Sequence, residues 1–313
     1  MDTVVKKRKN VPANLKSVGS SIWNCDAARF LKKLPEKKLF DLVVTSPPYN
    51  IGKAYERKRE LDEYISFHTD VICEAVLRLK NTGAFCLQVG NFVQDGEILP
   101  LDYLFHPIFR ELGMKLRNRI VWHYGHGLHQ QRRFSGRYET VLWFTKSDDY
   151  VFDLDAVRIP PKYPGKRAYR GPRAGQLSGN PLGKNPEDVW EVKDSRHDLW
   201  QIPNVKAGHV EKTEHPCQFP VGLIERLILA LTKKNALVFD PFAGTGSAGV
   251  AALLHKRRFW GCEIDSDYAE LAVERLRRTV SGEERFRSHA KPIYDHKKSN
   301  LSIDPRAYAI AAE

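Results

Sequence analysis

Apolar and polar positions follow two different rhythms along the chain. Short runs rich in β-branched and aromatic residues predict strands, and longer segments with apolar positions three or four residues apart predict helices. The predicted strands are Ile22-Trp23, Phe40–Thr45, Gly83–Val89, Arg119–Trp122, Glu139–Phe144, Ala236–Phe239 and Phe259–Ile264. The predicted helices end at Leu34 or span 62–79, 101–112, 220–231, 247–254 and 268–280. This alternation predicts an α/β fold with a mostly parallel, twisted sheet that is covered on both faces.

The stretch from about 155 to 215 has a different character. It is rich in proline, glycine, arginine and lysine, has no long periodic apolar segment, and carries interspersed aromatic residues. These are Tyr163, Tyr169, Trp190 and Trp200. The pattern predicts a loop-rich insertion with small strands.

Composition and charge narrow the function classes. The chain has 313 residues, of which 42% are apolar, and a formal net charge of +12. An excess of positive charge of this size favours a polyanionic partner, although a basic surface without such a partner would also explain the charge. No apolar run is long enough to span a bilayer, and the basic N-terminus lacks the apolar stretch of a secretory signal. The five cysteines form no CxxC pair, so we expect reduced thiols, a cytoplasmic protein and no metal site.

A glycine-rich turn follows the predicted strand that ends at Asp240. The turn reads Asp240-Pro241-Phe242-Ala243-Gly244-Thr245-Gly246-Ser247 and leads into a helix. Its glycines let the backbone approach a ligand, and amides at a helix start can hold a carboxylate such as that of S-adenosylmethionine. Glu263 ends the next strand, where an acid can accept ribose hydroxyls. The spacing GTGSAG also fits a nicotinamide-type turn, and a tight turn without any ligand stays open.

The sharper motif is Ser46-Pro47-Pro48-Tyr49, which follows the strand Phe40–Thr45. Two prolines leave carbonyls without neighbouring N–H groups, so a carbonyl and the Ser46 hydroxyl can accept hydrogen bonds from an exocyclic amino group. Tyr49 can stack on a base that has been flipped out of the helix. The alternative is a strand-terminating Pro-Pro turn with a packed tyrosine.

Together the two motifs resemble the amino-group DNA methyltransferases of the restriction–modification type, over roughly residues 20–280. The tetrad matches the family's (D/N/S)PP(Y/F) catalytic pocket, and Phe242-Ala243-Gly244-Thr245-Gly246 matches its FxGxG turn. The tetrad-first order resembles the permuted β group. The resemblance implies a Rossmann-like S-adenosylmethionine-dependent methyltransferase fold with an inserted recognition region.

The resemblance also extends the set of cofactor-binding residues. His215-Pro216-Cys217-Gln218-Phe219-Pro220 is similar to the family's HPxQxP segment, with Phe219 where relatives often have lysine. By the same resemblance Asp26 reaches the adenine amino group of the cofactor, although it is as well suited to cap a helix. The implied cofactor-binding residues are Asp26, Asp240, Pro241, Phe242, Gly244, Gly246, Ser247, Glu263, His215 and Pro216.

The resemblance divides the chain into parts. We expect a basic N-terminal tail at 1–18, a catalytic part at 19–154, a target-recognition insertion at 155–214, a cofactor-binding part at 215–282 and a peripheral segment at 283–313.

Three histidines between Trp122 and Arg137 raise the question of a metal, but a phosphate-facing loop fits better because no acid or cysteine completes a ligand set. The expected DNA-binding residues are Lys53, Arg57, Arg132, Arg133, Arg137, Arg167 and Arg170.

The expected reaction is methyl transfer to the exocyclic amino group of a flipped base in double-stranded DNA. In the family that the chain resembles, serine in the first tetrad position is commoner in cytosine-N4 enzymes and aspartate in adenine-N6 enzymes, so the resemblance implies cytosine N4 over adenine N6. RNA or protein-amide methylation, a nicotinamide-dependent oxidoreductase and an inactive DNA-binding module are the competing hypotheses. A cognate restriction endonuclease and a homodimer are left open as partners.

Overall fold

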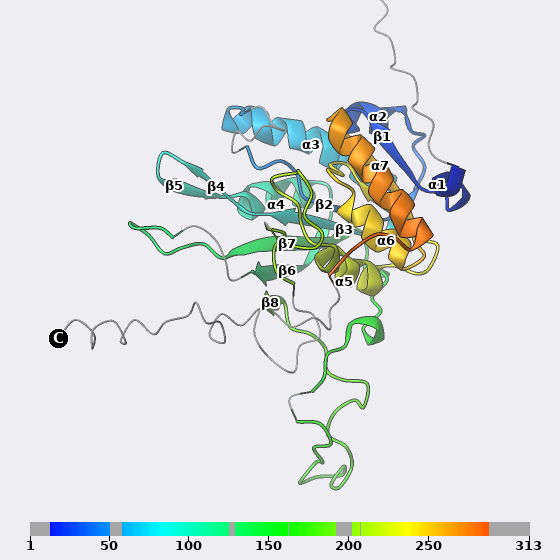
Figure 1. Cartoon of the computed structure of the whole chain (residues 1–313). Helices are drawn as coiled ribbons and strands as arrows, with labels where there is room; N and C mark the ends of the chain where they lie inside the picture. The colour runs from blue at the N-terminus through cyan, green and yellow to red at the C-terminus, as the bar shows by residue number, and fades with distance from the viewer. Residues whose placement is uncertain are drawn as a thin grey trace, which may run out of the picture.

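The computed structural model describes residues 13–50, 58–124, 129–161, 163–191, 202–206 and 208–287. Its centre is an eight-stranded sheet with the order β1-β10-β9-β2-β3-β7-β6-β8 (Figure 1). Within this sheet β7 runs opposite to the other strands, because its pairings with β3 and β6 are antiparallel while the remaining pairings are parallel. The strands are β1 (Ser21–Asn24), β2 (Phe40–Thr45), β3 (Leu79–Val89), β6 (Lys115–His123), β7 (Tyr138–Thr145), β8 (Val189–Glu191), β9 (Leu237–Asp240) and β10 (Arg258–Glu263).

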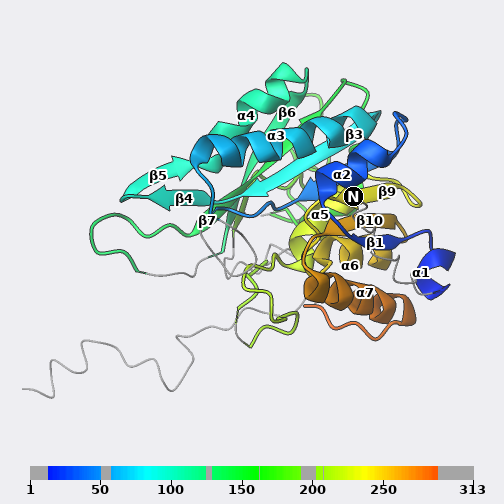
Figure 2. The same ribbon diagram turned by 90° about the horizontal axis from the view of Figure 1, so that it is seen from above.

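Helices cover both faces of the sheet, as Figure 2 shows from above. One layer holds α2 (Ala27–Lys33), α3 (Leu61–Arg78) and α4 (Leu101–Glu111). The other holds α5 (Val221–Leu231), α6 (Ser247–Leu254) and α7 (Ser266–Ser281), with the short α1 (Ala13–Ser17) beside α7. The predicted α/β fold with a mostly parallel sheet is therefore confirmed.

Alternation along the central strands fills two hydrophobic cores. In β2, Leu42 and Val44 belong to the core under α5 and α6, whereas Val43 belongs to the core under α3 and α4. In β9, Val238 and Phe239 divide between the two cores in the same way. Successive side chains of a strand point to opposite faces, so a continuous apolar run is what a strand buried on both sides requires.

Most predicted elements are present with shifted ends. Leu79, predicted as the last residue of a helix, begins β3 instead, and β6 begins before the predicted Arg119. Four elements were not located from the sequence: the short helix α1, the strands β4 (Asn91–Gln94) and β5 (Glu97–Pro100) of a two-stranded sheet, and a 3₁₀ turn, η1 (Asp155–Val157). The strand β8 lies in the insertion, for which only unplaced small strands were predicted. The strands β4 and β5 are short and half-exposed, so they lack the apolar run that signals a buried strand.

Two peripheral segments pack against the fold where the structure describes them. The predicted loose tail forms α1 at its end, and Leu15 is fully buried. The predicted peripheral C-terminal segment begins with packed residues, because the side chain of Glu284 is 7% exposed and pairs with Arg275. Residues 1–12 and 288–313 lie outside the described part.

The predicted insertion stands off the sheet at its β8 edge (Figure 1). Its described residues are mostly exposed and are held by two isolated bridges, Ile159 with Lys184 and Arg167 with Leu177. It is anchored by Trp190 on β8, whose ring lies 4.5 Å from the Arg226 guanidinium on α5. Within the described residues, no helix has the length and apolar character needed to cross a membrane.

Candidate active site

The two sequence motifs meet at the carboxyl ends of neighbouring strands. β2 and β9 pair in parallel, so the segment after Thr45 and the turn after Asp240 emerge at the same edge of the sheet. The Thr45 hydroxyl donates to the Asp240 carboxylate at 2.6 Å, which ties the two strand ends together. A cavity of about 320 Å³ opens there, and its lining includes Ser46, Tyr49, Gly244 and Glu263. This is the edge where doubly wound sheets hold their ligands.

The segment Ser46 to Tyr49 forms one wall of the cavity. Its prolines, Pro47 and Pro48, line the same wall. The Ser46 and Tyr49 hydroxyl oxygens lie 3.2 Å apart. Tyr64 of α3 donates its hydroxyl to the Pro48 carbonyl at 2.7 Å, so that carbonyl already has a partner. The sequence predicts only that a proline carbonyl of this segment receives the amino group, and Tyr64 occupies one of the two lone pairs of the Pro48 carbonyl.

The glycine-rich turn also lines the cavity, through residues between Phe242 and Ser247. Gly246 has φ +79°, and a β-carbon there would lie 3.0 Å from Ala272 of α7. Gly244 has φ +50° and faces the His215 ring, with its amide donating to Glu263 at 2.7 Å. Both glycines adopt the left-handed backbone region that other residues rarely occupy. At Gly244 the turn therefore brings bare backbone to the cavity, whereas Gly246 packs against α7.

Two carboxyl groups sit at this turn. Glu263 accepts backbone N–H groups from Gly244 and Asp265, and burial raises its pKa. Asp240 accepts hydrogen bonds from Thr45 and the Phe242 amide, and burial raises its pKa to about 7. Asp240 is fully buried beneath the cavity, so its place is structural support for the turn rather than the cavity surface.

The segment His215 to Pro220 closes the side of the cavity next to the turn. The His215 ring packs edge-on against Tyr268 at 4.5 Å, and its Nδ1 accepts the Cys217 amide at 3.1 Å. Burial lowers the pKa of His215 to about 4, so the ring is neutral at neutral pH. Pro216 lines the cavity beside it, and the Gln218 amide lies 3.5 Å from the Ser247 hydroxyl.

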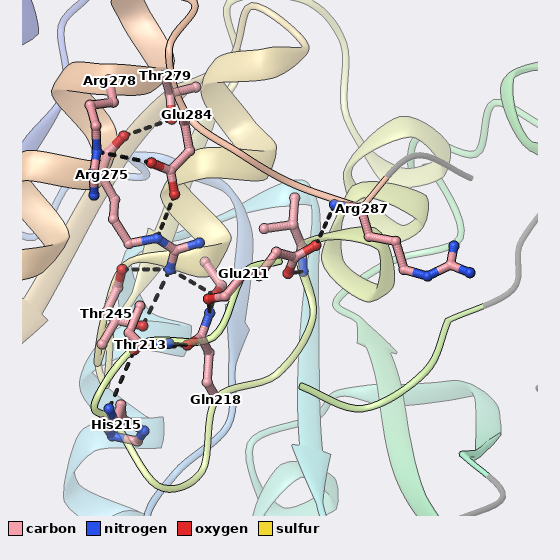
Figure 3. Close-up of polar contacts among 12 residues, drawn as sticks. Glu211, Thr213, His215, Gln218, Thr245, Arg275, Arg278, Thr279, Glu284 and Arg287 are labelled. Carbon is pink, nitrogen blue, oxygen red and sulfur yellow. Dashed lines mark hydrogen bonds and ion pairs between the residues drawn. The ribbon is translucent and has the colours of Figure 1, made fainter. Parts of the chain in front are cut away.

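A buried polar network lies behind the turn (Figure 3). Arg275 of α7, with 1% of its side chain exposed, donates to the Thr245 carbonyl at 2.9 Å and pairs with Glu284 at 2.7 Å. Glu211 accepts the amides of Val221 and Arg287. The network thus joins the residues after α7 to the turn and to the segment His215 to Pro220.

Several residues that line the cavity were not predicted from the sequence, and Glu139 is the most important of them. This residue begins an apolar strand, where an acidic side chain is unexpected, and that exception was the sequence signal for a functional role. Its carboxylate accepts hydrogen bonds from the Tyr49 hydroxyl at 3.4 Å and from the Gln88 amide. Trp122 and Tyr124 line the same side of the cavity.

The remaining predicted site residues lie elsewhere. Asp26 caps α2 by accepting the Arg29 amide at 2.8 Å and is not among the residues lining the cavity, so the structure favours the capping alternative. The predicted DNA-binding arginines fall on two segments, the loop before β7 and the insertion. Arg132, Arg133, Arg167 and Arg170 are exposed, and Arg137 is half-exposed. Lys53 and Arg57 lie outside the described residues, and among those described no cluster of His, Cys, Asp or Glu could hold a metal.

The fold and this cavity define an S-adenosylmethionine-dependent methyltransferase. The sequence model of the family described as DNA methylase (N6_N4_Mtase) matches residues 40–274. The chain belongs to this family of amino-group DNA methyltransferases of the restriction–modification type.

Two curated relatives illustrate the similarity. The Type II methyltransferase M.BglII of Bacillus subtilis is 42% identical over 295 residues, which cover 94% of this chain and 79% of the relative. The DNA adenine methyltransferase YhdJ of Escherichia coli K12 is 30% identical over 270 residues, which cover 85% of each chain.

Solved structures agree on the fold. The cytosine-N4-specific PvuII DNA methyltransferase superimposes with a TM-score of 0.62 at 21% identity, over 85% of this chain and 94% of that one. TTHA0409 of Thermus thermophilus, complexed with S-adenosyl-L-methionine, gives a TM-score of 0.59 at 26% identity, over 84% of this chain and 95% of that one. The cofactor of this chain is S-adenosyl-L-methionine.

The residues around the turn fit this cofactor. Gly244 lines the cavity without a side chain, and the start of α6 offers backbone N–H groups to a carboxylate. Each oxygen of Glu263 accepts one backbone N–H and keeps a lone pair for a hydroxyl donor.

Proposed function

We propose that this enzyme methylates the N4 amino group of cytosine in duplex DNA. The family fixes methyl transfer to an amino group of DNA, and the base assignment is our own step. The observation that carries it is Ser46 at the cavity wall, in the position where adenine-directed tetrads more often have aspartate. The relative YhdJ is named an adenine methyltransferase, so adenine N6 is the second candidate.

The proposed roles of the cofactor-side residues follow from their positions. The start of α6, including Ser247, would hold the methionine carboxylate, and Glu263 would accept the ribose hydroxyls. Phe242 and the neutral His215 ring would enclose the cofactor with apolar surface. When bound, S-adenosylmethionine supplies an electrophilic methyl group on a sulfonium.

The tetrad residues act on the target base. The Ser46 hydroxyl and the Pro47 carbonyl accept the two amino hydrogens, which turns the nitrogen lone pair out of conjugation with the ring. We assign this role to the Pro47 carbonyl rather than to that of Pro48, because Tyr64 already donates to the Pro48 carbonyl at 2.7 Å. Tyr49 stacks on the flipped base with its ring face. No base needs to act before attack, because the amino proton becomes acidic only after the nitrogen is alkylated.

The basic segments give DNA binding its strength. The loop before β7 exposes Arg132 and Arg133 close in sequence to cavity residues, and the insertion exposes Arg167 and Arg170. Arginine contacts to phosphates release counterions and hold the duplex without reading its sequence. We assign phosphate contacts to the loop and target recognition to the insertion.

The test is to identify the methylated nucleoside. The enzyme is incubated with methyl-labelled S-adenosylmethionine and mixed-sequence duplex DNA, which is digested and analysed by mass, with matched RNA as the control substrate. N4-methylcytosine is the expected product. N6-methyladenine would overturn the base assignment within the family, and label in RNA alone would overturn DNA as the substrate.

A further inference from the structure

A chain of hydrogen bonds leads from the catalytic serine to a carboxylate that the sequence motifs do not include. Ser46 Oγ lies 3.2 Å from the Tyr49 hydroxyl, which donates to Glu139 Oε2 at 3.4 Å. The same carboxylate oxygen accepts the side-chain amide of Gln88. All but Gln88 line the cavity, so the chain begins where the amino group of the target would bind and ends in the cavity wall.

The carboxylate sets the direction of this chain. An ionised carboxylate only accepts hydrogen bonds, so the single hydroxyl proton of Tyr49 points to Glu139. The Tyr49 oxygen is then free to accept, and the Ser46 proton points to Tyr49. As a result the lone pairs of Ser46 Oγ face the cavity, which is the orientation that an amino-group donor requires.

The placement of a charge here needs a reason beyond packing. A glutamine at 139 could accept from Tyr49 through its carbonyl without the desolvation penalty of a partly buried carboxylate. Members of the family with aspartate at the first tetrad position have a carboxylate directly at the amino group, and this chain has a serine there. A carboxylate two hydrogen bonds away restores an acceptor for the proton that the reaction must release.

We propose that Glu139 is the terminal proton acceptor of the methyl-transfer reaction and reaches the amino group through Tyr49 and Ser46. A bond forms between the amino nitrogen and the methyl carbon, while the bond from that carbon to the sulfonium sulfur breaks and its electron pair stays on sulfur. The alkylated nitrogen is positive and gives one proton to Ser46 Oγ. Ser46 passes its own proton to Tyr49, and Tyr49 passes its proton to Glu139. The step rests on the proposed function.

The surroundings of Glu139 suit this role. Burial raises the pKa of Glu139 to about 7, and the hydrogen bonds from Gln88 and Tyr49 oppose this rise by stabilising the ionised carboxylate. Burial and the charge of Glu139 raise the pKa of Tyr49 well above its ordinary value, so Tyr49 relays a proton without becoming an anion. The groups that reach this cluster are Tyr49, Gln88 and Tyr124 beside Glu139, Arg137 beside Tyr124, and Cys217 beside Tyr49.

The test compares wild type with Glu139→Gln, an isosteric variant that keeps the acceptor for Tyr49. Single-turnover transfer to duplex DNA is measured across the neutral pH range. In the wild type the rate should rise as Glu139 loses its proton near pH 7 and then level off. Glu139→Gln should lower the plateau by about 100-fold or more, the usual contribution of a positioned base, and should lose the inflection.

A second variant, Gln88→Met, separates relay from support. It removes the hydrogen bond that lowers the pKa of Glu139, so the inflection should move to higher pH while the plateau is kept. A third readout needs no turnover: the infrared band of a protonated carboxyl, which should grow as the pH falls through about 7 in the wild type and be smaller in Glu139→Gln. Asp240 contributes to this band in both proteins, because burial raises its pKa to about 7 as well.

An unchanged plateau and inflection in Glu139→Gln overturn the relay while leaving the methyltransferase assignment intact. An unmoved inflection in Gln88→Met, or an infrared difference that does not titrate near neutral pH, counts against it in the same way. If the wild type yields N6-methyladenine, only the base assignment fails, because the relay serves either amino nitrogen. Absence of transfer by the wild type to DNA overturns the proposed function, and the relay falls with it.

Discussion

The change Gly246→Ala isolates the packing of the cofactor turn against α7. Gly246 has φ +79°, and an added β-carbon would lie 3.0 Å from both Ala272 Cβ and Leu276 Cδ1 and 3.3 Å from Ala272 Cα. The leucine end can swing aside, but Ala272 is fixed in a helix. α6 and α7 must therefore separate by a few tenths of an ångström, as expected for an overpacked core.

Gly282→Ala is the matched control. Gly282 has the same φ of +79°, and nothing lies within 4 Å of the β-carbon built there. Both variants carry the left-handed conformation, which destabilises a non-glycine residue by about 1–2 kcal/mol. Only Gly246→Ala adds the steric term, about 1–3 kcal/mol for overpacking. The difference between the two variants measures that term alone.

The assay is urea unfolding followed by tryptophan fluorescence, with calorimetric binding of S-adenosylmethionine alongside. Gly246→Ala should lose about 2–5 kcal/mol of unfolding free energy and bind the cofactor more weakly. Gly282→Ala should lose about 1–2 kcal/mol and bind normally. Equal destabilisation of the two variants with unchanged binding would refute the reasoning about the turn.

Two further predictions concern the support of the turn and DNA binding. Arg275→Met should destabilise the fold by about 3 kcal/mol, because it leaves Glu284 in a buried site without its main partner. The control Arg277→Met, on the exposed side of the same helix, should change stability by less than about 1 kcal/mol. Thermal unfolding of both variants checks this difference, and equal effects would contradict it. Arg132→Ala should reduce the slope of log affinity for duplex DNA against log salt by about 1 if the side chain contacts a phosphate, and an unchanged slope in a fluorescence titration would remove it from the interface.

Sequence reasoning found the sheet and both walls of the cavity for a physical reason. Strands buried on both faces are continuous apolar runs, and motifs placed at their carboxyl ends must meet if the strands are parallel neighbours. β2 and β9 are such neighbours, and the contact between Thr45 and Asp240 joins residues 195 positions apart. Hydrophobic periodicity does not predict the order of strands in the sheet, so the proximity of the two motifs was inferred from the resemblance.

What sequence reasoning missed depends on side chains from distant elements. The contact between Tyr49 and Glu139 spans 90 positions, and Tyr64 reaches Pro48 from the buried face of α3. Periodicity identifies that face as apolar and cannot tell which of its residues carries a polar tip toward the site. The short exposed strands β4 and β5 were missed because neither buries an apolar run.

The most direct measurement is the single-turnover rate of Tyr49→Ala at saturating S-adenosylmethionine, with cofactor binding measured on the same protein. Tyr49 lies at the proposed site of the base and the glycine turn at the proposed site of the cofactor, in one cavity. Tyr49→Ala should therefore bind the cofactor as the wild type does and lose most methyl transfer, while Gly244→Val should lose cofactor binding. Wild-type turnover in Tyr49→Ala, or wild-type cofactor affinity in Gly244→Val, would contradict this division of the site.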